Sequence, residues 1–139
     1  MLEYNVTAIR KDATASLAQS GEAEIMLDTG LKGRPDALNP AELFLASIAA
    51  CMIKGIERVC PILDFELSGV RVQLHAKRQD APPMITHVNY EILVNSQESD
   101  ARLDLLHKNV KKYGTIFNTV SKAVAIEGRL VRSAENDAG

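Results

Sequence analysis

Cys51 is the residue of this sequence best suited to covalent chemistry, and it ends the run NPAELFLASIAAC at residues 39–51. A cysteine thiolate is a nucleophile, and a neighbouring positive charge favours the thiolate over the thiol. Lys54 lies three residues further on, on the same helical face. Arg34, in the loop before the run, has a planar fork that can hold a thiolate and a substrate together. A buried cysteine can equally be an inert small apolar residue, so both interpretations stay open at this point.

The second cysteine, Cys60, does not offer Cys51 a disulfide partner. An α-helix rises about 1.5 Å per residue, so nine residues separate the two Cα atoms by about 13–14 Å, whereas a disulfide needs about 7 Å or less. The two side chains would also point to opposite faces of the helix. We therefore interpret Cys60 as structural.

A helix must carry Cys51, because residues 39–42 form a strong helix start. Asn39 is the expected N-cap, Pro40 suits the first helical position, and Glu42 stands where a capping-box carboxylate reaches back to the cap. For Glu42 we favour this capping role over catalysis. The eleven residues 43–53 are almost wholly apolar, too short a stretch to span a bilayer, so protein should surround them. We expect the helix to stop before Pro61.

Alternating apolar and polar residues predict strands on both sides of this helix. They lie at residues 2–9, 14–18, 22–28, 70–77, 88–94 and 125–132. Residues 100–113 and 116–123 show helical spacing instead. This order predicts an α+β fold with mostly antiparallel sheet. We expect residues 1–132 to form a single domain and residues 133–139 a disordered tail.

Composition excludes several classes of function. The net charge is −2, aromatic residues make up 4 %, and Trp is absent, so neither nucleic acid nor an anionic membrane is an expected partner. The N-terminus lacks the layout of a signal peptide, and two cysteines without an export signal indicate the cytoplasm. His75, His87 and His107 do not have the spacing of metal ligands, and we expect all three on the surface. No metal or other cofactor is expected.

Several of these motifs together resemble the OsmC/Ohr superfamily. They are a Gly- and Pro-containing loop, N-P-x-E-L, an apolar helix ending in A-A-C, a hairpin, and V-S-K-A before a last strand. The resemblance implies an OsmC-like fold in which mostly antiparallel sheets wrap around a buried central helix in an intertwined homodimer. It also implies an activity, since well-studied members reduce organic hydroperoxides or hydrogen peroxide with a pair of cysteines.

Carried over to this sequence, the resemblance makes Cys51 the peroxidatic cysteine. The resolving position falls on Asn118, which cannot form a disulfide. The glutamate that orients the active-site arginine in peroxidases falls on Ala41, next to Glu42. The resemblance also implies an arginine from the loop before the helix. Arg34 is the candidate for it and Lys32 the alternative.

Two functions are compatible with these residues. The first is a thiol-dependent peroxidase in which Cys51 becomes a sulfenic acid that an external thiol reduces. The second is a non-catalytic dimer that binds a small apolar ligand in a pocket between subunits. Cys51 and Arg34 are the expected catalytic residues, and Asn118, Lys54 and Glu42 are the expected binding residues.

Overall fold

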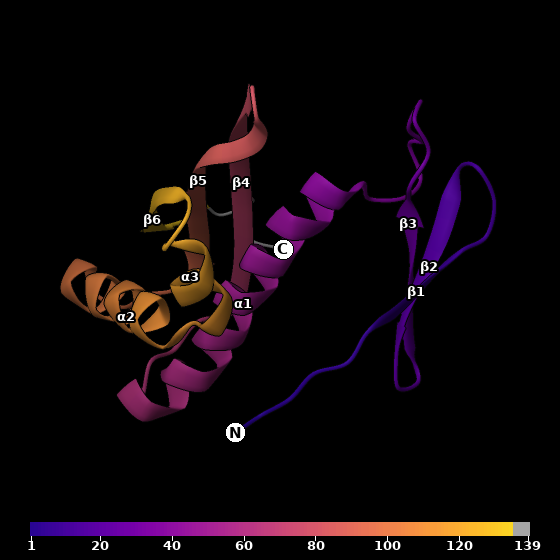
Figure 1. Ribbon diagram of the computed structural model, residues 1–139. Helices are drawn as coiled ribbons and strands as arrows, with labels where there is room; N and C mark the ends of the chain where they lie inside the picture. Colours follow the sequence, from indigo (N-terminus) through magenta and orange to yellow (C-terminus); the bar gives the residue numbers. More distant parts are fainter. Residues whose placement is uncertain (135–139) are drawn as a thin grey trace. The chain divides into compact units, whose positions relative to one another are not determined.

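The structure is a computed structural model that describes residues 1–134 of the chain (Figure 1). The chain forms two compact units, Met1–Ala46 and Ser47–Gly139, and each is described here by itself. Helices and strands are mixed in the order expected of an α+β fold, which confirms the predicted class. A single domain over residues 1–132 stays a prediction. Of the predicted tail, residues 135–139 lie outside the described residues, whereas the Ser133 N–H donates to the Val94 carbonyl at 2.9 Å.

The first unit contains an antiparallel sheet of β1 (Thr7–Arg10), β2 (Ala15–Ser20) and β3 (Ala23–Asp28), in the order β1-β2-β3. The predicted strand at residues 2–9 is wrong in its first half. The register explains this: Thr7 pairs with Gln19, and β2 ends one residue later at the turn to β3. Gly21 in that turn has a φ of +59°, a conformation that a residue without a Cβ adopts easily.

Helix α1 (Pro40–Leu63) begins with the predicted capping box. The Glu42 N–H donates to Asn39 Oδ1 at 2.8 Å, and the Asn39 N–H donates to Glu42 Oε1 at 3.0 Å. The predicted stop before Pro61 is wrong, since α1 continues through it to Leu63. A proline removes only its own N–H donor, and the Cys60 carbonyl still accepts from the Phe65 N–H at 2.9 Å, so the last turn remains closed.

The second unit contains a sheet in the order β4-β5-β6, built from β4 (Gly69–Asp80), β5 (Pro83–Asn95) and β6 (Ala125–Arg132). β4 and β5 form the predicted antiparallel hairpin, whereas β5 and β6 pair in parallel. A parallel pair needs a long crossover, and α2 (Asp100–Tyr113) and α3 (Thr115–Val120) supply it. α2 and β6 have the predicted bounds, while α3 is shorter than the predicted helix at 116–123.

The core of the second unit joins one face of β5 to one side of α1 and α2 (Figure 1). Its buried side chains include Val88, Ile92 and Val94 of β5, Ile48, Met52, Ile56 and Val59 of α1, and Leu103, Leu106 and Val110 of α2. Other positions of α1 are not buried within the second unit, since Ile53 is 38 % and Ile62 75 % exposed. The prediction that protein surrounds this helix is therefore not met by one chain alone.

Candidate functional site

Cys51 lies in the fourth turn of α1, half-buried, with its thiol against the junction of α2 and α3. A Cβ built on Gly114, the residue of that junction, would lie only 3.2 Å from Cys51 Sγ. The same Cβ would also come within 3.1 Å of the Val110 carbonyl oxygen and 3.2 Å of Phe117 Cβ. Gly114 therefore leaves the space in which the thiol sits. The sequence shows Gly114 only as the residue that follows the helix predicted at 100–113.

The side of α1 that carries Cys51 continues along the end of α2. Gly55, one turn further on, is buried, and a Cβ there would meet Val110 Cγ1 at 3.4 Å. Arg58 lies two turns beyond Cys51, and its Nη1 donates to the Tyr113 carbonyl at 3.3 Å. Residues spaced by three and four share a helical face, so Cys51, Gly55 and Arg58 form one stripe. Arg58 was not among the predicted site residues, although this spacing could have revealed it.

The structure brings Asn118 and Cys51 to the same junction. Asn118 follows Gly114 by one helical turn and donates its N–H to the Gly114 carbonyl at 2.8 Å. Its side-chain Nδ2 donates to the Lys112 carbonyl at 3.2 Å, which ties α3 to the end of α2. Lys54 is exposed, on the same helix as the thiol. Two of the expected binding residues are therefore close to Cys51 in the fold, and Glu42 is a cap at the start of α1.

Arg34 belongs to the first unit, where three of its N–H groups are held in a fixed fork. Nε and Nη2 donate to the two carboxylate oxygens of Asp36 at 2.6 and 2.9 Å, and Nη1 donates to Thr14 Oγ1 at 3.4 Å. The Asp36 hydrogen bonds raise the pKa of Arg34, and the same bonds lower the pKa of Asp36. A guanidinium has five N–H donors, so two remain for a ligand.

The loop that presents Arg34 is organised by Asp28, a buried carboxylate at the end of β3. Asp28 accepts from the Gly30 N–H at 3.2 Å and from the Arg34 N–H at 3.1 Å, and its own N–H donates to the Leu38 carbonyl at 2.9 Å. Lys32, the alternative cation, is exposed on this loop. Because both cations belong to the first unit and Cys51 to the second, the pairing of either cation with the thiol stays a prediction.

Next to the thiol junction lies a hydrogen-bonded pair that the sequence did not predict. His107 was expected on the surface, but it is half-buried and its Nε2 lies 2.6 Å from the Tyr90 hydroxyl. Burial raises the pKa of Tyr90 to about 12, so the phenol keeps its proton, and the tautomer of His107 decides which of the two groups donates. The Tyr90 ring also meets the Phe117 ring edge-on, with centroids 6.4 Å apart. The helical period alone could not show that β5 places a tyrosine opposite His107.

The His107 pair makes stability depend on pH. Burial, and secondly the charge of Lys111, lower the pKa of His107, while Asp104 opposes them. The unfolded chain therefore takes up a proton more readily, and the folded state loses stability as pH falls from about 6.5 through the folded pKa. We expect His107→Asn to flatten the decline of the melting temperature between pH 7.5 and pH 5. His75→Asn, at an exposed histidine of β4, is the control, and an equal slope in both variants would contradict the prediction.

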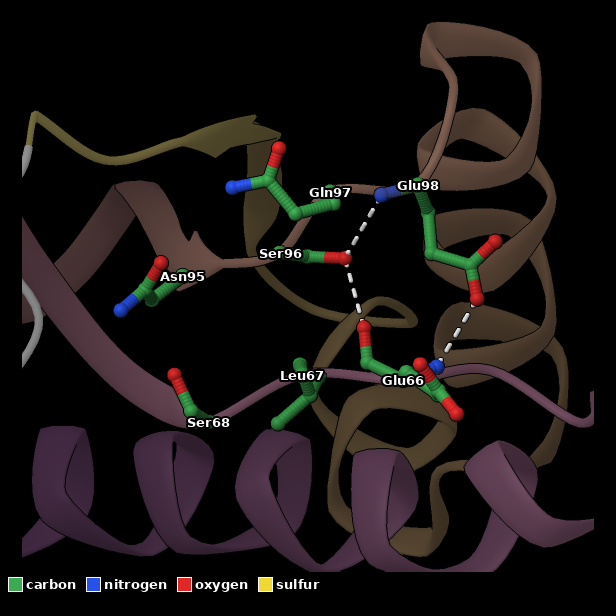
Figure 2. Close-up of a pocket in the computed structure, with 7 residues that line it drawn as sticks. All are labelled: Glu66, Leu67, Ser68, Asn95, Ser96, Gln97 and Glu98. Atoms are coloured by element: carbon green, nitrogen blue, oxygen red, sulfur yellow. Dashed lines mark hydrogen bonds between the residues drawn. The ribbon is translucent and has the colours of Figure 1, made fainter.

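A separate hollow of about 620 Å³ lies between the start of β4 and the end of β5 (Figure 2). Figure 2 shows Glu66 facing Ser96 and Glu98 across it. Ser96 Oγ donates to the Glu66 carbonyl at 2.6 Å and accepts from the Glu98 N–H at 3.1 Å, and Glu98 Oε2 accepts from the Glu66 N–H at 2.8 Å. These bonds fasten two chain segments together. None of the predicted site residues lines this hollow, and within residues 1–134 no group of side chains forms a metal site.

A sequence profile described as OsmC-like protein matches residues 33–128, more than half of the chain. The chain belongs to the OsmC-like family. A relative named hydroperoxide reductase from Mycoplasma genitalium is 23 % identical over 137 residues, covering 93 % of this OsmC-like chain and 97 % of its own. No helix within residues 1–134 is both long and apolar enough to cross a membrane.

Solved structures share the OsmC-like fold. The OsmC-like protein from Mycoplasma pneumoniae superposes with a TM-score of 0.85 at 18 % identity, over 96 % of this chain and 99 % of its own. The organic hydroperoxide resistance protein OhrB of Bacillus subtilis has a TM-score of 0.66 at 17 % identity, over 94 % of this chain and 98 % of its own. The predicted OsmC-like fold of the chain is thereby confirmed, while the intertwined homodimer stays a prediction.

Proposed function

We propose that this OsmC-like protein is a thiol-dependent peroxidase with Cys51 as its peroxidatic cysteine. The single observation that carries the proposal is the position of Cys51, half-buried in α1 with its thiol against the glycine junction of α2 and α3. A relative that spans nearly the whole chain is named hydroperoxide reductase, which supports the same chemistry. In the reaction, the Cys51 thiolate attacks one peroxide oxygen and the O–O bond breaks. The alcohol leaves with a proton, and Cys51 becomes a sulfenic acid.

Arg34 is the cation that we assign to this step. Asp36 and Thr14 fix its guanidinium and leave two N–H donors, which suit a thiolate sulfur and a peroxide oxygen at the same time. Charge moves from sulfur to the leaving oxygen as the O–O bond breaks. A fixed donor pair that contacts both atoms stabilises this transfer without having to reorganise.

The sulfenic acid has no resolving cysteine within the chain. Asn118 holds the family's resolving position, and Cys60 lies on the same continuous helix nine residues beyond Cys51. An external thiol therefore condenses with the sulfenic acid to give a mixed disulfide and water. A second thiol then attacks the external sulfur of this disulfide. This releases the Cys51 thiolate and forms a disulfide between the two external thiols.

We further propose that the protein is a cytoplasmic homodimer. Many large apolar side chains are exposed in the single chain, more than scattered surface residues explain. In the first unit they are Leu2, Tyr4, Val6, Ile9, Ile25, Met26, Leu31 and Leu38. Ile53 and Ile62, which are exposed at two separate positions of α1, also support a second copy as cover. Both cysteines are free, as expected of a reducing compartment.

A second candidate function is the binding of a small apolar ligand. A hollow of about 310 Å³ in the first unit favours it, because its lining is mostly apolar and includes Val6, Ile25 and Leu43. A ligand of this kind would leave Cys51 chemically idle.

One experiment separates the two functions. The Cys60→Ser protein is treated with cumene hydroperoxide, and the sulfenic acid is trapped with dimedone and located by mass spectrometry. We expect rapid modification of Cys51, slower modification with hydrogen peroxide, and none in Cys51→Ser/Cys60→Ser. A thiol that resists oxidation, together with a melting temperature raised by an inert analogue such as cumyl alcohol, would instead establish the binding function.

A further inference from the structure

We propose that the external thiol is anionic, and that Lys54 and Arg58 of α1 with Lys112 of α2 attract it to Cys51. These three residues are called the basic surface below. The inference rests on the proposed peroxidase function and names the chemical class of its reductant.

Charge is unevenly distributed along the chain. The sequence carries 18 acidic residues and a net charge of −2, so the protein as a whole does not attract anions. Residues 105–126, which form most of α2, the junction and α3, nevertheless contain no Asp or Glu. The lysines of this segment are Lys108, Lys111, Lys112 and Lys122. The segment that carries the thiol junction is therefore positively charged in a chain whose net charge is negative.

Contacts in the second unit bring two cations of the basic surface to Tyr113, the residue before Gly114. Arg58 Nη1 donates to the Tyr113 carbonyl at 3.3 Å, and Lys112 Nζ lies 5.2 Å from the centre of the Tyr113 ring. Tyr113 is 52 % exposed, and it directly precedes Gly114, which lies against Cys51 Sγ. Arg58 and Lys112 thus both contact Tyr113, the residue next to the glycine that lies against the sulfur.

Lys54 completes the basic surface on α1. It lies three residues from Cys51, within one turn on the same face, and its side chain is exposed. The acidic residue of this part of the helix is Glu57, about 240° round the helix from Cys51. Its charge acts on the other cysteine, since burial and then Glu57 raise the pKa of Cys60. Glu57 therefore lies further round the helix from Cys51 than Lys54 or Arg58 does.

The charge matters most in the reductive half of the cycle. Without a resolving cysteine, every turnover needs two encounters with a thiol from solution. A carboxylate on that thiol is attracted by the basic surface while its sulfur attacks Cys51, forming the S–S bond as water leaves. Steering by local charge raises such encounter rates and weakens as salt is added.

The first test uses two aromatic disulfides that react with the Cys51 thiol whether or not the protein reduces peroxides. One is 5,5′-dithiobis(2-nitrobenzoate), a dianion, and the other is neutral 2,2′-dithiodipyridine. In the Cys60→Ser background, we expect Lys54→Gln/Lys112→Gln to lower the ratio of anionic to neutral rate constants by about four- to tenfold at low salt. Lys77→Gln, at an exposed lysine of β4, is the matched control and should leave the ratio unchanged. Equal ratios in both variants would overturn the inference.

The second test compares reductants of similar size and different charge. The Cys51 sulfenic acid is reduced with 3-mercaptopropionate, 2-mercaptoethanol or cysteamine. Each rate constant of the double variant is divided by that of the Cys60→Ser parent, which cancels the intrinsic reactivity of the thiol. We expect a selective loss for 3-mercaptopropionate. If the lysine substitutions instead slow only the oxidation of Cys51 by a carboxylated hydroperoxide, the basic surface attracts the peroxide and not the reducing thiol. The inference is then wrong. If no sulfenic acid forms, the proposed function is wrong. The ratio of the two disulfide rate constants still tests whether the basic surface attracts anions to Cys51.

Discussion

Gly128→Ala is expected to destabilise the protein by about 3 kcal/mol, lowering the melting temperature by roughly 10 °C. Gly128 of β6 pairs with Tyr90 of β5, and the tyrosine ring lies directly over it. A Cβ at position 128 would lie 2.1 Å from the Tyr90 carbonyl oxygen and 2.5 Å from Tyr90 Cγ. A side chain could swing away from such an overlap, but a backbone carbonyl in a ladder cannot. The strands must therefore separate or the Tyr90 ring must leave its bond to His107.

The matched control is another glycine-to-alanine change in the same unit. A Cβ at Gly55 would meet Val110 Cγ1 at 3.4 Å, an ordinary contact, and alanine favours a helix over glycine by about 1 kcal/mol. Gly55→Ala should therefore be neutral or slightly stabilising. Thermal and urea unfolding of both variants give the comparison. A Gly128→Ala protein within 1 kcal/mol of the parent would contradict the packing of Tyr90 over β6.

Arg34→Lys is expected to slow the oxidation of Cys51 by about 10²-fold while leaving the fold intact. Lysine keeps the charge but cannot reproduce the fork that Nε and Nη2 make with Asp36, nor the bond to Thr14. Its ammonium would therefore not be held for the thiolate and the peroxide together. Stopped-flow measurement of sulfenic acid formation with cumene hydroperoxide gives the rate constant.

Two further variants make this prediction specific. Arg78→Lys changes an exposed arginine that makes a comparable bond, to Asp80 two residues on at 3.3 Å, and it should have no effect. Lys32→Gln tests the alternative cation on the same loop. A normal rate in Arg34→Lys combined with a large loss in Lys32→Gln would assign the role to Lys32.

The elements that the sequence predicted best are those with strong local signals. α2 and β6 have the predicted bounds because their apolar residues repeat with one clear period. The capping box of Asn39 and Glu42 was predictable because both partners lie within four residues. The same locality placed Cys51 on a helix and Arg34 in the loop before it.

Features that depend on long-range pairing could not be predicted in this way. The approach of Gly114 to Cys51 joins residues more than 60 positions apart, and the Tyr90–His107 bond joins a strand to a helix. The parallel pairing of β5 with β6 depends on the crossover through α2 and α3. The Arg34–Asp36 fork is local, yet it depends on the loop conformation that Asp28 imposes, which no periodicity encodes.

The amide of Asn118 fastens α3 to the end of α2, at the position that the family resemblance assigns to a resolving cysteine. A two-cysteine enzyme must bring its second sulfur to the first in every cycle, so part of its catalytic cycle is a conformational step. In the one-cysteine cycle proposed for this protein, the sulfenic acid waits for a thiol from solution, and its lifetime is set by the concentration of that thiol. The fraction of oxidised protein at steady state would then follow the balance between peroxide and thiol in the surrounding medium.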